Sequence, residues 1–333
     1  MSEEHAFAQY IRILGKGRNG SRALSGQEAF DAMSLIMSDQ VQPIQLGAFL
    51  MLMRVKEETP EEVAAFVRAI RAHLNVPKDG VNVDLDWSSY AGKKRQLPWY
   101  LLATLLMAES GIRVFMHGAS GHTAGRIYTK NVLPMLGVPV ATSFEEARRH
   151  LGEMNFAYMD LEHLSPKLHH IIELRPLLGL RSPVHTIARL LNPFDAPYMM
   201  QGIFHPGYRP THQVAAQLLG QPHMAVIKGE GGEIERNPDS SCLIQGVHNG
   251  ELTEEEWPPM FDKRHVRNDE LDVSRLARVW AGTEEDDYGV AAVIGTVALT
   301  LHMMGRARDR ADAEAQATAM WQARNREKFR AAA

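Results

Sequence analysis

The sequence RVFMHGASGHTAGR, residues 113–126, joins a short apolar run to a loop of small residues. The run predicts a strand, and the pattern that follows the loop predicts a helix. A strand that leads through a loop into a helix is the repeating unit of an α/β domain. The same alternation predicts strands at 81–85, 113–116, 156–159, 199–204, 224–228 and 242–247. It predicts helices at 99–109, 125–136, 144–151, 211–218, 288–304 and 311–333.

The first 75 residues, in contrast, carry helical patterns only. Ser25 and Glu28 have the spacing of a capping box, which marks the start of a helix. Thr59 followed by Pro60 marks another start, because proline suits the first helical position. We therefore predict a small helical domain at 1–75, joined by about 165–181, and an α/β domain formed by 76–164 and 182–333. The acidic stretch 251–287 is interpreted as an irregular excursion.

The composition is typical of a globular protein with a sizeable core. The chain has 333 residues, of which 45% are hydrophobic and 23% charged, so disorder over the whole length is excluded. No run of about 18 apolar residues occurs, so no membrane span or membrane partner is predicted. The N-terminus lacks the pattern of a signal peptide, and the single Cys242 excludes an intramolecular disulfide. These features predict a cytoplasmic location.

Charge is unevenly distributed along the chain. The net charge of −4 argues against a strongly basic protein. Residues 88–136 nevertheless hold six Lys or Arg against Glu109 alone, whereas residues 250–290 hold twelve Asp or Glu against five Lys or Arg. Such a protein can present a basic face to an anion. The alternative is that these charges lie on separate solvated surfaces.

The loop SSYAGKKR, residues 88–95, is the first candidate for phosphate binding. It connects a predicted strand to a predicted helix, where free backbone N–H groups and the helix dipole favour an anion. The candidate contacts in this loop are Ser88, Ser89, Gly92, Lys93 and Lys94. Alternatively, the basic run is a solvated turn.

The loop at 117–126 is richer in residues that suit a phosphate. Its glycines allow a close approach of the backbone, its hydroxyl groups donate hydrogen bonds, and an arginine can bind in a bidentate manner. The candidate contacts in this loop are His117, Gly118, Ser120, Thr123 and Arg126. His117 has the alternative role of a hydrogen-bonded structural histidine.

The segment KGEGGEIER, residues 228–236, holds the candidate metal ligands. Glu233 and Glu235 lie beside glycines at the end of a predicted strand, and magnesium needs only one or two carboxylates when a phosphorylated substrate is bound. Lys228 and Arg236 flank these carboxylates. We favour the alternative, in which the two basic residues pair with them.

Three arginines lie in the segment that interrupts the α/β alternation. Arg175, Arg181 and Arg189 follow one another near the predicted hinge between the two domains. An arginine at a domain junction either contacts a ligand or ties the domains together. Both roles are retained as hypotheses for these residues.

Six short motifs in this order resemble the anthranilate phosphoribosyltransferase family. They are QLGAFLM at 45–51, KEET at 56–59, His117-Gly118, LGLR at 178–181, LLNP at 190–193 and QGIFHP at 201–206. The resemblance covers nearly the whole chain. It implies a small helical domain and a large α/β domain with a central mixed sheet flanked by helices, as in nucleoside phosphorylases and phosphoribosyltransferases. It also implies a homodimer through the helical domain and a cleft for phosphoribosyl pyrophosphate with magnesium.

The departures from the family pattern affect the donor site. The family's glycine-rich pyrophosphate loop, GTGGD, falls on 88–92, where most of the glycines are missing. The lysine of the family's KHGNR loop is Met116, and its metal-binding Asp-Glu pair falls on Gly232-Glu233. The second arginine of the family's pair is Pro176. Each change removes charge stabilisation that phosphoribosyl transfer needs, so we predict a degenerate donor and metal site.

The stretch DWSSYAGKKR at 86–95, followed by HG at 117–118 and GHT at 121–123, resembles a distinct branch of this family. At least one kind of member in that branch binds nucleic acid without strong sequence preference. Binding would then depend on counterion release and weaken steeply with salt. The candidate nucleic-acid contacts are Lys93, Lys94, Arg95, Arg126, Lys130, Arg175, Arg181 and Lys228. No cofactor is predicted, and magnesium is expected only if phosphoribosyl pyrophosphate binds. The alternative is an active glycosyl or phosphoribosyl transferase that uses this phosphorylated sugar with an altered acceptor.

Overall fold

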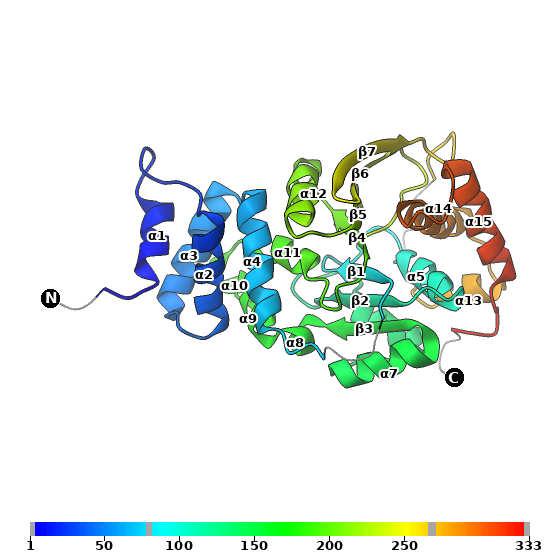
Figure 1. Cartoon of the computed structure of the whole chain (residues 1–333). Helices are drawn as coiled ribbons and strands as arrows, with labels where there is room; N and C mark the ends of the chain where they lie inside the picture. The colour runs from blue at the N-terminus through cyan, green and yellow to red at the C-terminus, as the bar shows by residue number, and fades with distance from the viewer. Residues whose placement is uncertain (1–3, 78–81, 266–270, 330–333) are drawn as a thin grey trace.

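The computed structural model describes residues 4–77, 82–265 and 271–329 (Figure 1). The chain begins with a bundle formed by α1 (Ala8–Gly15), α2 (Gly26–Met37), α3 (Pro43–Lys56) and α4 (Pro60–His73). Ser25 caps α2 and Thr59 caps α4, and in both cases the glutamate three residues on completes a capping box. Both predicted helix starts are therefore confirmed.

Later helices pack on this bundle. The segment after the third strand forms α8 (Leu161–Leu164), α9 (Pro166–Glu173) and α10 (Arg175–Leu178). The buried Leu168, Ile171 and Ile172 of α9 belong to the same hydrophobic core as the bundle. Lys167 of α9 forms an ion pair with Asp39, just after α2. The chain thus returns from the α/β part to the first helices before it enters the second half of the sheet.

The α/β part contains a seven-stranded sheet with the order β3-β2-β1-β4-β5-β6-β7. Its strands are β1 (Leu85–Ser89), β2 (Val114–Gly118), β3 (Phe156–Asp160), β4 (Tyr198–Ile203), β5 (His223–Lys228), β6 (Cys242–His248) and β7 (Glu251–Trp257). The first five strands run parallel, and β6 and β7 are antiparallel to their neighbours. The sheet is therefore mixed, and the predicted fold class is confirmed.

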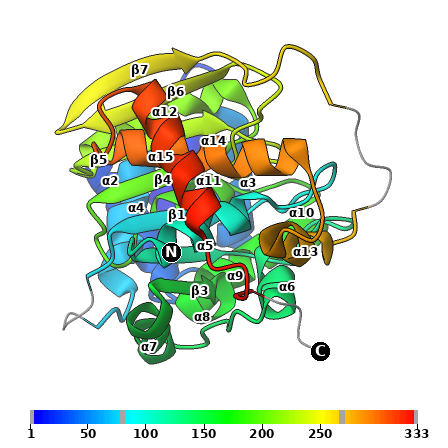
Figure 2. The same cartoon turned by 90° about the vertical axis from the view of Figure 1, so that its right-hand side faces the viewer.

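Helices cover the two faces of the sheet. They are α5 (Tyr100–Glu109), α6 (Thr129–Val132), η1 (Leu133–Leu136), α7 (Phe144–Met154), α11 (Val184–Ile187), η2 (Ala188–Leu190), η3 (Pro206–Tyr208), α12 (Arg209–Leu218), α13 (Arg275–Ala281), α14 (Asp287–Met303) and α15 (Arg310–Ala323). Figure 2 shows α14 and α15 across one face. Along β2, Phe115 belongs to the core shared with the helical bundle, whereas Val114 and Met116 belong to the core under α5 and α14. This alternation is what a strand buried on both faces requires.

In the described part of the chain, no helix is long and apolar enough to span a membrane.

Several predicted boundaries were wrong. The strand predicted at 81–85, whose first residue lies outside the described residues, is found at Leu85–Ser89. Polar residues such as Asp86 and Ser88 interrupt the apolar pattern by which a strand is predicted, although all five positions are buried. The helix predicted at 125–136 begins at Thr129, because 125–128 continues the loop. The last helix ends at Ala323 rather than 333, with 330–333 outside the described residues.

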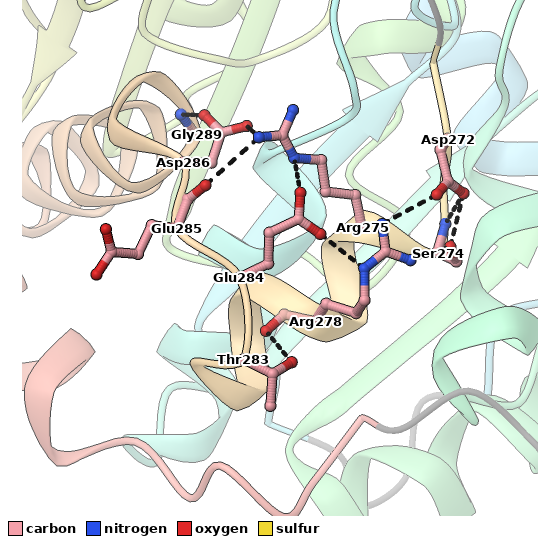
Figure 3. A network of polar contacts seen from close by, with 9 residues as sticks. All are labelled: Asp272, Ser274, Arg275, Arg278, Thr283, Glu284, Glu285, Asp286 and Gly289. Atoms are coloured by element: carbon pink, nitrogen blue, oxygen red, sulfur yellow. Dashed lines mark hydrogen bonds and ion pairs between the residues drawn. The ribbon is translucent and has the colours of Figure 1, made fainter.

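The acidic stretch is not irregular throughout. Its first residues form the edge strand β7, in which every position except Trp257 is exposed. Further on, α13 is tied to the start of α14 by ion pairs (Figure 3). Arg275 lies 2.7 Å from Glu284 and 3.2 Å from Asp286, which also caps α14 by accepting from the N–H of Gly289. Part of the excess acidity therefore neutralises arginines of the same segment.

Candidate anion-binding site

Four arginines, one from the loop after β2 and three from residues 175–189, lie close enough for their charges to act on one another. These hinge arginines are Arg126, Arg175, Arg181 and Arg189. Arg175, at the start of α10, donates to the Thr123 hydroxyl over 2.5 Å and to the His122 carbonyl over 2.7 Å. Arg181 donates to the same hydroxyl over 3.5 Å. The loop after β2 and the segment after α9 are therefore in direct contact, which brings their basic residues together.

The hinge arginines lack acidic partners. Among residues 4–77, 82–265 and 271–329, none of the four forms an ion pair with a carboxylate. Burial lowers the pKa of Arg181, and the charges of Arg175, Arg126 and Arg189 lower it further. Like charges that are partly removed from water destabilise one another. A bound anion would relieve that repulsion, so the arrangement favours an anionic ligand.

Two histidines lie within this positive cluster. Burial lowers the pKa of His122 to about 4, and Arg181, Arg175 and Arg189 act in the same direction. Burial, with His122 and Arg181, lowers the pKa of His185 to about 3. Both rings are therefore neutral at pH 7, and the Nε2 atom of His185 is buried without a hydrogen-bond partner. An anion placed here would raise the pKa of both rings.

The first predicted phosphate loop is bound by the protein's own carboxylates. The N–H groups of Ala91 and Gly92 both donate to one oxygen of Glu233 over 2.6 Å. Lys93 is fully buried, and its ammonium group lies 2.5 Å from Glu235. Burial opposes the charge of Lys93, yet Glu235 and Glu230 raise its pKa overall. The basic loop and the acidic segment 229–235, which we call the acidic turn, therefore satisfy each other.

The remaining carboxylate of the acidic turn holds the outer part of the loop. Glu230 accepts from the N–H of Arg95 over 2.6 Å and lies 3.1 Å from the ammonium group of Lys93. The pairing of the acidic turn with Lys228 and Arg236, which we favoured from the sequence, is wrong. Lys228 is exposed, and Arg236 binds Glu314 over 3.0 Å.

These carboxylates do not fit a magnesium ion in their present arrangement. Glu233 accepts two N–H groups, and Glu235 accepts the Lys93 ammonium group and the N–H of Tyr100, which lies 2.9 Å away. Lys93 competes with a metal for Glu235, and the one oxygen of Glu233 without a hydrogen-bond partner offers magnesium a single ligand. Within the described residues, no group of three or more His, Cys, Asp or Glu side chains is placed to hold a metal.

Several predicted phosphate contacts lie inside the sheet. Ser88, Ser89, His117 and Gly118 are strand residues and fully buried. His117 bonds to the Tyr90 hydroxyl over 2.7 Å and to Asp86 over 3.3 Å, which corresponds to its alternative, structural role. Gly118 is required by packing, because a Cβ atom there would lie 1.9 Å from the Ser89 carbonyl oxygen. These residues shape the floor beneath the loops.

The remaining candidates divide into paired and exposed groups. Ser120 donates to Asp160 over 3.0 Å, and Lys130 forms an ion pair with Glu162. Lys94, Arg95 and Lys228 have exposed side chains. Lysines and arginines that look equivalent in sequence therefore differ in their availability to a ligand.

Some residues of the site were not among the sequence-based candidates. His122 is held in the cluster by a 2.9 Å hydrogen bond to the Tyr90 carbonyl. Glu230 connects the acidic turn to the basic loop through the N–H of Arg95. Tyr90 of the basic loop lies beside a hinge arginine, because the Arg189 guanidinium is 5.9 Å from its ring centroid. The available signal was charge complementarity between KKR and EGGEIE, which a reading of each motif alone does not use.

Comparison with protein families gives two matches that together cover most of the chain. The helical bundle domain of the glycosyl transferase family matches residues 8–74, and the a/b domain of that family matches residues 100–323. The anthranilate phosphoribosyltransferase of Oleidesulfovibrio alaskensis is 30% identical over 283 residues, which cover 81% of this chain and 83% of that protein. An uncharacterized protein of Aquifex aeolicus is 28% identical over 297 residues, which cover 86% of this chain and 88% of that protein.

Solved structures show the same architecture. The anthranilate phosphoribosyltransferase of Thermus thermophilus superposes with a TM-score of 0.78 at 21% identity, covering 96% of this chain and 94% of that chain. The Saccharomyces cerevisiae anthranilate phosphoribosyltransferase in complex with PRPP and Mg gives a TM-score of 0.75 at 16% identity, with the same coverage. At these identities the likeness shows the fold.

Proposed function

This chain belongs to the anthranilate phosphoribosyltransferase-like glycosyl transferase family, and we propose that it uses that fold to bind nucleic acid without sequence preference. The observation that carries the proposal is the cluster of hinge arginines without carboxylate partners in the described residues. The sugar-phosphate backbone of a nucleic acid supplies the missing negative charges at regular spacing. Such binding gains free energy from counterion release and needs no contact with base edges. The cytoplasm, the location predicted from the sequence, contains such partners.

The contact surface that we propose is narrower than the one predicted from sequence. It comprises Arg126, Arg175 and Arg181 together with the exposed side chains of Lys94, Arg95 and Lys228. Arg189 is buried and was not among the predicted contacts, so it is not included. Lys93 and Lys130 are left out, because their charges are paired with Glu235 and Glu162. A cation that already has a close carboxylate partner releases few counterions when a phosphate approaches.

We also propose that two copies associate through their helical domains. Ile44 and Val55 on α3 and Leu177 on α10 are 82, 83 and 84% exposed, although all three are large and apolar. Large apolar side chains that are exposed to solvent favour a contact with a second copy. Light scattering after size exclusion tests this: the wild type should have the mass of a dimer, and Val55→Asp with Leu177→Asp should give a monomer. A monomeric wild type would contradict it.

The test of nucleic-acid binding is a titration of a labelled single-stranded oligonucleotide of mixed sequence, followed by fluorescence anisotropy. We expect binding at low salt and a linear fall of log affinity with log salt, with a slope of about −0.7 for each phosphate neutralised. A second oligonucleotide of unrelated sequence should bind with similar affinity. Absence of binding at low salt, or binding that ignores salt, would exclude this function.

The family membership supports one alternative, a transferase that uses phosphoribosyl pyrophosphate with a different acceptor. In that case the donor would bind where the basic loop and the acidic turn now meet. Calorimetry with phosphoribosyl pyrophosphate and magnesium separates the two functions. Saturable heat at micromolar donor, followed by release of pyrophosphate with an acceptor, would favour the transferase and count against a degenerate donor site.

A further inference from the structure

We propose that the carboxylate of Glu233 is a built-in anion that occupies a phosphate-type site on the backbone of residues 91–92 and so excludes phosphate groups from it. This inference goes beyond nucleic-acid binding and does not depend on it. It concerns a different part of the molecule, the junction between the basic loop and the acidic turn.

The backbone of the loop forms the anion site. The consecutive N–H groups of Ala91 and Gly92, which we call the nest, converge on one oxygen of Glu233 over 2.6 Å each. Consecutive N–H groups that converge in a tight turn form a concavity that binds anions. Gly92 has a φ of +67°, and a Cβ atom there would lie 3.0 Å from the Ile127 carbonyl oxygen and from the Tyr128 ring. The turn that produces the nest is therefore a glycine turn.

The nest is held by contacts other than Glu233. Lys93 exchanges two backbone hydrogen bonds with Ile127, with lengths of 2.9 and 2.8 Å. The nest also lies just beyond β1, at the carboxyl end of a central parallel strand and ahead of α5. In α/β proteins this edge of the sheet is where anionic ligands bind. We therefore expect the nest to keep its shape when the carboxylate is removed.

The acidic turn places Glu233 with little freedom to move. A Cβ atom on Gly229 would lie 1.6 Å from the Glu233 carbonyl oxygen, and one on Gly202 would lie 2.6 Å from the Glu233 carbonyl carbon. The backbone of Glu233 thus packs directly against the backbones of Gly229 and Gly202. Its side chain is fully buried, so the carboxylate is part of the fold and not a surface group that swings away.

Two of the hinge arginines flank the nest. Arg126 donates to the carbonyl groups of Ala91 and Gly92 over 2.8 and 3.1 Å. Arg189 donates to the Gly232 carbonyl over 2.9 Å, and the charge of Glu233 acts on its guanidinium group. Two N–H donors with guanidinium groups nearby form the setting of a phosphate site. The second oxygen of Glu233 is buried without a hydrogen-bond partner, so a single carboxylate fills this setting incompletely.

The test compares pyrophosphate binding by the wild type and by Glu233→Ala in metal-free buffer. Inorganic pyrophosphate is the probe, and calorimetry and thermal unfolding are the readouts. We expect the wild type to bind pyrophosphate only weakly, through the hinge arginines and outside the nest. We expect Glu233→Ala to bind at least tenfold more tightly and to be stabilised by pyrophosphate, since a ligand of the native state raises its stability. Acetate should restore part of the lost thermal stability.

Glu62→Ala is a matched control. Glu62 is also fully buried and accepts two backbone N–H groups, from Leu24 over 2.8 Å and Thr59 over 2.9 Å. These donors come from different segments and bind different oxygens, so they form no nest. Glu62 also pairs with Lys56 over 2.7 Å, so Lys56→Ala is added to the control variant to avoid a newly unpaired cation. This variant should lose stability without gaining affinity for pyrophosphate. A gain equal to that of Glu233→Ala would show that any loosened fold binds the probe, and would overturn the proposal.

Glu233→Gln keeps the test decisive if the alanine variant does not fold. It preserves the shape and one accepting oxygen but removes the charge, so pyrophosphate should bind it more tightly than the wild type. Equal binding by the wild type and a folded Glu233 variant, or absence of binding by both, would show that the inference is wrong. The same samples are titrated with oligonucleotide, and failure of the wild type there would overturn the proposed function alone.

Discussion

Two groups of arginines in this molecule have opposite surroundings. Near α13 and α14, Arg275 and Arg278 share Glu284, and each has a second partner, Asp286 and Asp272 respectively (Figure 3). The hinge arginines have no such partner anywhere in the described ranges. The paired group comes from a segment that also carries acidic residues, whereas residues 175–189 contain arginines and no acidic residue.

The difference shows which arginines the fold itself uses. A guanidinium group that meets carboxylates on two sides holds neighbouring elements together, and its charge is neutralised within the protein. A group of guanidinium ions that lie close to one another and form no ion pair with a carboxylate costs free energy in the unliganded protein. Proteins retain such a cost chiefly at functional sites, which is why we place the ligand at the hinge.

The largest effect should come from Lys93, which lies beside the exposed Lys94 and brings the same comparison into one loop. Lys93→Ala leaves Glu235 buried without its cation, which should cost about 3–5 kcal/mol of unfolding free energy. Lys94→Ala should leave stability unchanged and weaken oligonucleotide binding. Urea denaturation and anisotropy measure the two effects. The double variant Lys93→Met with Glu235→Gln removes both charges and should regain the lost stability. A stable Lys93→Ala, or a double variant that stays destabilised, would contradict the assignment of Lys93 as a structural cation.

Charge reversal at the hinge should produce the next largest effect. Arg175→Glu with Arg181→Glu should weaken oligonucleotide binding about a hundredfold at low salt, because two phosphate contacts become repulsive. Thermal stability should hold or rise, since the repulsion among the hinge arginines is relieved. Arg275→Glu with Arg278→Glu reverses the same number of charges in the paired group. That control should lose stability and retain binding, and equal losses of binding in both variants would abolish the comparison.

Much of the fold follows from local sequence. The capping residues Ser25 and Thr59 and the alternation of short apolar runs with helices predict the two-domain architecture, because these signals depend only on near neighbours. The strand β1 was misplaced because its buried polar residues are satisfied by distant partners, as Ser89 is by Thr129 over 2.8 Å. The edge strand β7 was missed because it buries almost nothing and so carries no apolar pattern.

The candidate site was less predictable for the same reason. The sequence singled out the two candidate phosphate loops and the acidic turn as separate motifs. It does not reveal that Glu233 and Glu235 reach residues about 140 positions earlier, nor that Lys93 is buried while Lys94 is exposed. Which carboxylate neutralises which cation is decided by tertiary structure, and availability to a ligand follows from that pairing.

A smaller effect is expected from the paired group itself. Glu284→Gln removes the carboxylate that Arg275 and Arg278 share, on a partly exposed surface where ion pairs contribute little. The melting temperature should fall by about 2 °C, and the fall should shrink in high salt. Oligonucleotide affinity should not change. A gain of affinity would mean that unpaired arginines bind nucleic acid wherever they lie, and the hinge would have no special status.

The smallest effect should be a dependence of binding on pH. In the free protein the pKa of His122 is held at about 4, below its value of about 6.5 in an unfolded chain. The unfolded state therefore binds more protons between these values, and stability should decline as pH falls from about 6.5 towards 4. A phosphate beside the hinge arginines raises the pKa of His122 and of His185, so the complex takes up protons. Affinity should then rise a few-fold between pH 7.5 and pH 5.5 at constant ionic strength.

His122→Ala should remove most of this rise in affinity, whereas His248→Ala, outside the cluster, should keep it. Affinity that does not change with pH in the wild type would mean that the phosphates bind away from these rings, and the hinge would no longer be the place where the arginines meet their anion.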